Sequence, residues 1–196
     1  MIDNNKYVKA DVVYQRLTQT IKNKTIQFYD IVEWCAQCEL EEIGQVIEFF
    51  EHRDVDLTIA DYQAALPVGC WRIQAVKRNE SPVDYISNGN YLNFKKNYTN
   101  VKIDYLSIPL DAETGLPLII RGHEAACYFY CLKNLYMEDY LEGRIDQNRW
   151  NTIERNYDQA IALIPSRTST MSRNDRIKVL DAMKTVIYNY RNLKVR

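Results

Sequence analysis

The sequence predicts an α+β fold: a helical bundle with an inserted small antiparallel β-sheet and a C-terminal helix. Apolar residues recur at helical spacing near both ends of the chain, whereas short Val-, Ile-, Tyr- and Phe-rich runs alternate at period two in the middle. The 196 residues, of which 46% are hydrophobic and 26% charged, suffice for a core that buries roughly 70% of the unfolded surface.

We expect one main domain over residues 1–165 and a separate segment over residues 166–196. Within the domain, helices should cover residues 10–43 and 122–164, and a β-rich insert should cover residues 46–119. The C-terminal segment is expected to consist of a polar linker followed by a docking helix.

Two helices are expected at the start of the chain. The first covers residues 10–23 and has Asp11 as its N-cap. The second covers residues 30–42 and ends at Gly44. Their inward-facing residues, which recur at three- and four-residue spacing, are Val13, Leu17, Ile21, Ile31, Trp34, Cys35 and Cys38.

The middle of the chain is expected to form the sheet. Its predicted strands, which are rich in β-branched and aromatic residues, cover residues 46–52, 56–62, 72–77, 91–94 and 101–106. Turns are expected at Ser81–Pro82 and at residues 88–90, and Pro109 ends the last strand.

The third part of the chain is again helical. Residues 124–141 are apolar around much of the helix circumference, which predicts a central buried helix that ends at Gly143. Asp146 is expected to cap the next helix, and Pro165 to end it.

A last amphipathic helix should begin at Ser172 or Asn174 and carry two apolar stripes. The stripes, which suggest that the helix contacts more than one surface, consist of Ile177, Leu180, Lys184 and Ile187, and of Val179, Met183, Val186 and Tyr190.

Charge and hydropathy argue against a nucleic-acid-binding protein and against a membrane-spanning one. A net charge of −1 argues against binding nucleic acid by neutralising phosphates. The segment from Arg167 onward is locally basic, which indicates a solvated helix face or a protein contact, with a DNA-facing surface as the alternative. No apolar run approaches the roughly 20 residues that span a bilayer, and the N-terminus lacks the pattern of a secretory signal.

Four of the five cysteines form two helical pairs, Cys35 with Cys38 and Cys127 with Cys131. Because both pairs coincide with apolar stripes, we interpret them as buried core thiols. A zinc site and a redox pair are the alternatives. Five cysteines without a secretory signal fit a reducing compartment, so we do not expect disulfides.

No motif indicates catalysis. Gly122-His123-Glu124 resembles the beginning of a zincin helix, but the second histidine would have to stand at position 127, where the chain has Cys127. Phosphate-binding, dinucleotide-binding and serine-nucleophile signatures are missing from the sequence. We therefore expect a non-enzymatic protein with no catalytic residues, no cofactor and no metal.

Residues 111–117 predict a tight turn. The Asp111 side chain can accept hydrogen bonds from nearby backbone, Gly115 permits a positive φ, and Pro117 fixes the exit. This turn is part of a longer element with the pattern Tyr105, Ile108, Pro109, Asp111, Gly115, Pro117 and Ile119.

That element lies within residues 61–162, which resemble head-to-tail connector (neck ring, or adaptor) proteins of tailed bacteriophages, especially crAss-like phages. The resemblance also rests on a strand that ends at Leu66-Pro67 and on a helix pair joined at Gly143. It extends to a preceding helical unit marked by Asp30, Glu33, Trp34, Cys38, Leu40, Ile43 and Gly44. The helix after Pro165 is not covered.

The resemblance implies a connector-like domain in a structural virion protein of the phage neck. It implies a closed ring of roughly twelve copies that contacts the portal protein and other neck or tail rings. Genomic DNA would pass through the channel of the ring without sequence recognition, and no membrane would be involved. Assembly would take place in the cytoplasm of the bacterial host.

A cyclic ring needs two different contact surfaces on each copy, because its interfaces join unlike faces. The 15 tyrosines favour interfaces, since Tyr buries a large ring and keeps a polar hydroxyl. The expected interface residues are Tyr62, Tyr85, Tyr91 and Tyr98 in the sheet region, and Ile177, Leu180, Met183, Ile187 and Tyr190 in the last helix.

Two other functions remain open from the sequence. The chain could be a small cytosolic adaptor that binds one partner as a monomer, or a zinc protein whose ligands are the cysteine pairs.

Overall fold

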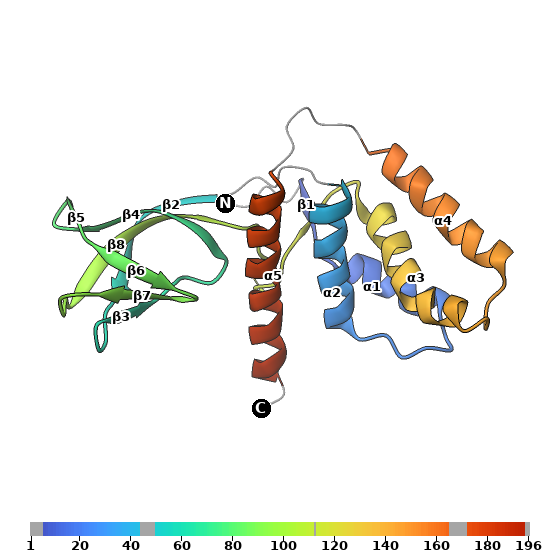
Figure 1. Ribbon diagram of the computed structural model, residues 1–196, viewed down its shortest axis with the longest axis horizontal. Coiled ribbons are helices and arrows are strands. Elements are labelled where there is room, and N and C mark those ends of the chain that lie inside the picture. The colour runs from blue at the N-terminus through green and yellow to red at the C-terminus, as the bar shows by residue number, and fades with distance from the viewer. Residues whose placement is uncertain (1–5, 44–49, 112, 165–171, 195–196) are drawn as a thin grey trace. The chain divides into compact units, whose positions relative to one another are not determined.

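The computed structural model describes residues 6–43, 50–111, 113–164 and 172–194, and it has the predicted α+β architecture (Figure 1). The chain divides into two compact units, each described here by itself. The helical unit consists of Met1–Ile47 and Leu110–Arg196, and the sheet unit consists of Glu48–Pro109. The separate C-terminal segment stays a prediction, although the last helix belongs to the helical unit.

The helical unit contains five α-helices, one π-helix and a two-stranded sheet among its described residues (Figure 1). The α-helices are α1 (Asp11–Thr20), α2 (Phe28–Gln37), α3 (Glu124–Leu141), α4 (Gln147–Ala162) and α5 (Arg173–Lys194). The π-helix η1 (Cys38–Ile43) continues directly from α2. Strand β1 (Tyr7–Val8) pairs with β9 (Ile119–Ile120) in antiparallel register.

The central helix α3 holds this unit together. It contacts α1, α2, η1 and α4, and its cysteines and Ala126 are almost fully buried. Tyr140 on α3 stacks on Trp150 of α4 with ring centroids 4.7 Å apart. This arrangement confirms the prediction that residues 124–141 form a buried central helix.

The predicted cap of the fourth helix is present: Asp146 Oδ1 accepts a hydrogen bond from Arg149 N at 2.8 Å. Ser172 caps α5, because its Oγ accepts from Asp175 N at 3.2 Å and donates to the Asp175 carboxylate at 2.7 Å. Gly143 ends α3 with φ 72°, as expected.

Other helix ends differ from the prediction. Asp11 is the first residue of α1 and not its N-cap, because the cap position is taken by Ala10 in a helical conformation. The second helix begins earlier, at Phe28, and widens into η1 at Cys38. Gly44 and Pro165 lie outside the described residues.

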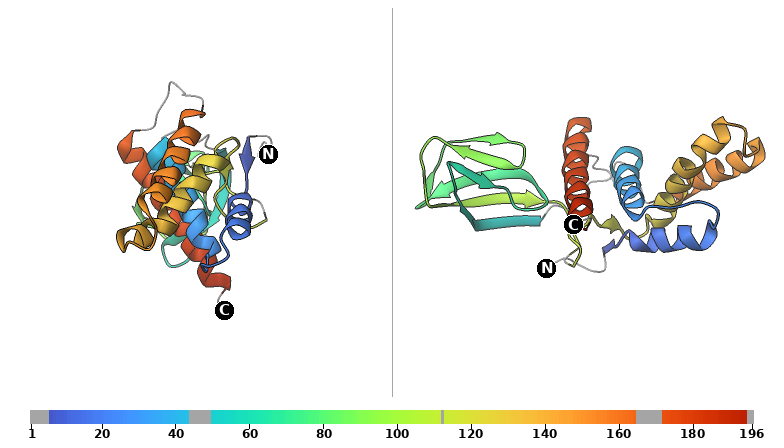
Figure 2. Two further views of the ribbon diagram at one scale, coloured as in Figure 1. Left: turned by 90° about the vertical axis from the view of Figure 1, so that its right-hand side faces the viewer. Right: turned by 90° about the horizontal axis from the view of Figure 1, so that it is seen from below.

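The sheet unit, drawn in cyan to green in Figure 2, holds two small antiparallel sheets. Their strand orders are β2-β8-β4-β5 and β3-β7-β6. Their strands are β2 (Phe50–Thr58), β3 (Gln63–Ala65), β4 (Cys70–Arg78), β5 (Ser81–Pro82), β6 (Tyr85–Asn88), β7 (Tyr91–Phe94) and β8 (Asn100–Ser107). The two sheets share one hydrophobic core, to which the smaller contributes Leu92 and Phe94 and the larger Val76, Val101 and Ile103. They are therefore packed face to face.

The strands predicted at residues 72–77, 91–94 and 101–106 are confirmed, and so is the turn after Asn88. The prediction of two separate strands at residues 46–52 and 56–62 was wrong, because the structure has a single strand, β2, in this region. β2 continues through a bulge between His52 and Val55, where Asp54 has φ 53°. Residues 46–49 lie outside the described part of the chain. Ser81–Pro82 forms strand β5, because the turn falls two residues earlier, at Asn79 and Glu80.

Candidate interaction surfaces

The outer face of the three-stranded sheet carries exposed apolar side chains. Along β7, Leu92 and Phe94 point into the core, so Tyr91 and Asn93 point outward. Cross-strand partners share a face, which places Ile86, the partner of Asn93, on this same outer side. Ile86 is 63% exposed and Tyr91 50% exposed. A solvent-facing sheet with two such residues is a candidate contact surface.

Tyr62 stands in a strained turn at the start of this sheet. Ala60 and Gln63 exchange backbone hydrogen bonds of 2.8 and 2.9 Å around a two-residue turn, in which Asp61 and Tyr62 have φ 50° and 65°. Such turns favour Asn-Gly, because a side chain in the left-handed region costs about 1–2 kcal/mol. Tyr62 is nevertheless 51% exposed, and its strained backbone makes it a candidate contact residue.

The other two tyrosines expected at this surface differ from Tyr62 and Tyr91. Tyr85 lies on the edge strand β6, where it is only just exposed. Tyr98 packs edge-on against Phe94 at 6.1 Å, with the Arg78 guanidinium 5.1 Å from its ring centroid. Tyr98 is therefore partly buried against the core of the sheet unit.

The sequence did not indicate two exposed apolar residues of the sheet unit, Val68 and Ile86. Ile86 belongs to β6, whose alternation is too short to be recognised. Val68 lies between Pro67 and Gly69 in a turn, where an apolar side chain has no periodic pattern around it. We call the four exposed residues Tyr62, Val68, Ile86 and Tyr91 of the sheet unit the sheet patch, of which Ile86 and Tyr91 share the outer face of the three-stranded sheet.

Most of the expected contact residues of α5 are buried inside the helical unit. Leu180, Met183 and Ile187 are almost fully buried where α5 packs on α2 and η1. Arg176 adds a 3.3 Å hydrogen bond to the carbonyl of Leu40. Five residues of the two predicted stripes thus face the chain's own core, namely Val179, Leu180, Met183, Val186 and Ile187.

Two large hydrophobic residues are exposed in the described part of α5. They are Ile177, which was expected at an interface, and Tyr188, which was not and is 66% exposed. The side chain of Tyr190 lies outside the described residues.

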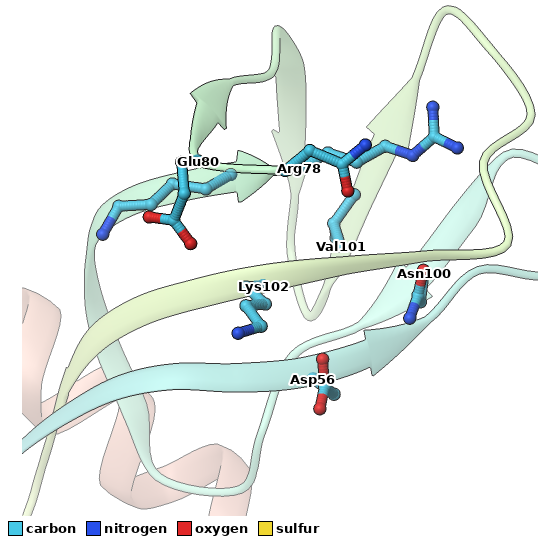
Figure 3. A pocket seen from close by; sticks show the side chains of 8 residues that line it. Asp56, Arg78, Glu80, Asn100, Val101 and Lys102 are labelled. Carbon is cyan, nitrogen blue, oxygen red and sulfur yellow. The ribbon is translucent and has the colours of Figure 1, made fainter.

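A charged pocket of about 200 Å³ lies on the outer face of the larger sheet (Figure 3). Figure 3 shows that Lys102 on β8 and Asp56 on β2 stand beside each other, while the Arg78 side chain extends away from Glu80. Three basic and two acidic side chains line it, so one positive charge remains. This mixture suits a protein contact better than a phosphate.

Asp104, which neighbours this pocket on the central strand, ties the larger sheet together. Its carboxylate accepts from Asp54 N at 2.9 Å, at the bulge of β2, and pairs with Lys77 on β4. The Asp54 N–H, followed by the Lys77 ammonium, lowers the pKa of Asp104. This network leaves Lys77 occupied, which further limits the pocket as an anion site.

The two cysteine pairs meet in the helical core, where all four thiols are fully buried. Hydrogen bonding to Cys127, followed by burial, raises the pKa of Cys38, and burial raises the pKa of Cys131. The prediction of buried core thiols is therefore confirmed. Within the described ranges, no three His, Cys, Asp or Glu side chains are placed to hold a metal ion.

A buried polar contact that the sequence did not indicate joins η1 to the start of α3. Glu39 and His123, both 3% exposed, are linked by a hydrogen bond of 2.7 Å from His123 Nδ1 to Glu39 Oε2. The second oxygen of Glu39 accepts from Ile120 N at 2.9 Å. Each oxygen of this carboxylate thus accepts a hydrogen bond, so the Glu39 side chain stabilises the contact between η1 and the start of α3.

These features describe an α+β protein with exposed apolar residues that are candidates for contact with other proteins. The chain belongs to the phage tail ring protein 1 family of crAss-like phages, which it matches over residues 3–84 and 78–193. The suspected family is thereby confirmed, and the match extends through α5, beyond the stretch that suggested it. A search of curated proteins found no significant match.

None of the helices in the described ranges combines the length and the apolar character needed to cross a membrane.

Proposed function

We propose that this tail ring protein forms a closed ring of roughly twelve copies in the phage neck, where it joins the portal vertex to the tail. The ring leaves a central channel for the genome. It acts by shape and contact and has no catalytic role. It is a component of the virion that is assembled in the host cytoplasm.

The observation that carries this proposal, beside the family itself, is the sheet patch. Its four large apolar residues are at least half exposed, whereas other apolar residues of the sheet unit form a buried core. Exposed aromatic residues on a small sheet are typical anchors of protein interfaces. In the ring, the sheet patch contacts a neighbouring copy, the portal protein or another ring.

The charge of the chain fits a channel through which DNA slides. A net charge of −1 leaves no excess of cations to neutralise phosphates, so bound DNA would not be held in place. Passage without sequence recognition is what a neck ring requires.

The proposal is tested by electron cryomicroscopy of isolated phage particles, together with mass photometry of the purified chain. A ring of this chain between portal and tail supports the proposal. A 23.1 kDa monomer that is absent from every particle overturns it and favours the monomeric adaptor.

Variants test the sheet patch. Ile86→Ser with Tyr91→Ser should reduce incorporation into particles at least about 10-fold, as expected for interface anchors. Asn93→Ser, on the same face of the sheet, is the matched control and should leave incorporation unchanged. Equal incorporation of the two variants would remove the sheet patch from the assembly.

A further inference from the structure

The helical unit contains a second pocket, of about 250 Å³, that its own side chains leave unfilled. Buried apolar residues form its floor, among them Ala10, Val32, Leu116 and Pro117. Because small-molecule sites usually measure roughly 300–1,000 Å³, this pocket suits a single large side chain of a partner protein.

Asp111 and residues 113–117 build one wall of the pocket. Asp111 Oδ2 accepts from both Thr114 N at 3.0 Å and Thr114 Oγ1 at 2.5 Å, and Gly115 N donates to the carbonyl of Asp111 at 2.7 Å. Gly115 has φ 67°, as this turn was predicted to need. The wall is thus fixed before a partner arrives, which lowers the entropic cost of binding.

The rim of the pocket is acidic. It carries the carboxylates of Asp11, Asp111 and Glu113 against a single cation, Lys9. Lys9 lies 3.2 Å from Asp111 and 2.5 Å from Glu113. Three acids and one base leave two negative charges beside an apolar floor. A fitting partner therefore presents an apolar or aromatic anchor with a basic residue next to it.

Helix α5 has this combination. It contains six Lys or Arg and two Asp, so its net charge is +4. Tyr188 is 66% exposed, and Arg191, also exposed, stands three positions later on the same face of the helix. Tyr and Arg are the side chains most enriched at the centres of protein interfaces. The sheet unit has seven Lys or Arg and eight Asp or Glu in Glu48–Pro109. It therefore lacks the net positive charge that would complement the acidic rim.

We infer that the acidic-rimmed pocket of one copy receives Tyr188 of a second copy of this chain, with Arg191 of that copy paired to the rim carboxylate Glu113. The inference rests on the proposed ring, since it supplies the two unlike faces that a cyclic interface joins. Copy after copy then repeats one contact, from the exposed face of α5 to the pocket.

Charge exchange on the full chain tests this contact. Arg191→Glu and Glu113→Arg should each weaken self-association at least about 10-fold in sedimentation velocity, because each puts like charges together. Glu113 has an exposed side chain, so neither variant should disturb the fold, which circular dichroism verifies. A mixture of the two variants should restore association, because every contact then joins opposite charges. The double variant in one chain should do the same.

Matched controls separate this contact from general charge effects. Lys178→Glu changes the net charge as Arg191→Glu does, three to four turns away on α5, and should leave association unchanged. Tyr188→Ala should weaken association at least about 10-fold, whereas Asn174→Ala, at the other end of α5, should not. Association that is insensitive to Tyr188→Ala and to both charge reversals overturns the inference.

The map of the assembled ring decides the matter even if the purified chain stays monomeric. A ring in which Tyr188 fills the neighbour's pocket supports the inference. A ring in which Tyr188 lies elsewhere overturns the inference and leaves the proposed function intact. Particles without a ring of this chain overturn the proposed function itself.

Discussion

Glu39 and His123, which lie 84 positions apart in the chain, are joined by a 2.7 Å hydrogen bond in the core of the helical unit. The same carboxylate binds Ile120 N, so one side chain on η1 fastens both β9 and the start of α3. Because both residues are 3% exposed, water cannot replace a lost partner.

Removal of this carboxylate should therefore lower the stability of the folded chain. Glu39→Ala is expected to lower the free energy of unfolding by about 3 kcal/mol, since it orphans two buried donors. Glu39→Gln retains an acceptor of nearly the same shape and should cost clearly less. Urea unfolding followed by circular dichroism measures both. Equal losses in the two variants would mean that packing, and not the hydrogen bonds, stabilises this site.

The Asp111 turn should make stability depend on pH in acid. Burial opposes ionisation of Asp111, but hydrogen bonds from Thr114 and Lys9 outweigh it and lower its pKa below 3.8. The ionised form is thus favoured in the folded state. The stabilisation is fully present above pH 3.8 and is lost as the pH falls through the lower folded-state pKa.

Asp111→Asn should accordingly lose less stability than the unmodified chain between pH 5.5 and pH 2.5. Urea midpoints at the two pH values check this. Asp146→Asn, which changes a solvent-exposed cap, serves as the control. An unchanged pH dependence in Asp111→Asn would show that the turn does not depend on the charge of Asp111.

The strained Tyr62 turn predicts a conflict between stability and assembly. Tyr62→Gly should raise the free energy of unfolding by about 0.5 kcal/mol, because Gly accepts φ 65° freely but is more flexible when unfolded. The same variant should assemble less well, because the exposed ring is gone. Tyr62→Ala, which loses the ring and keeps the strain, separates the two effects. If Tyr62→Gly instead lowered the free energy of unfolding, the backbone of Tyr62 would not be strained.

The thiols should differ in reactivity. Burial raises the pKa of Cys70 to about 11, so at pH 8 this half-buried thiol should react slowly with a disulfide reagent. The four core cysteines, which are fully buried, should react only after unfolding. A spectrophotometric count should give one thiol in the native chain and five in denaturant. Rapid reaction of Cys35 or Cys131 in the native chain would show that the helical core opens.

Candidate contact residues were only partly visible in the sequence. Tyr62 and Tyr91 could be proposed because aromatic residues beside turns favour interfaces. Tyr188 and Ile86 could not, because exposure depends on which face of α5 packs on α2 and on how β6 pairs with β7. Both facts are set by residues distant in the chain.

Local signals in the sequence determined the helices α3 and α4, the Asp146 cap, the Asp111 turn and the period-two strands β4 and β8. Each of these depends on neighbours within a few positions, through capping, backbone φ and side-chain periodicity. Family membership could be recognised from the same local elements. The sequence by itself thus determined what each segment is and to which kind of protein it belongs.

Only the tertiary structure decided how the segments contact one another. It joined two predicted strands into β2, because Asp104 on β8 binds the backbone at the bulge. It widened the end of α2 into η1 and turned Glu39 toward His123. It also buried most of the apolar residues of α5 and left Ile177 and Tyr188 exposed. Such outcomes depend on the free energy of contacts between distant residues, which no local pattern contains.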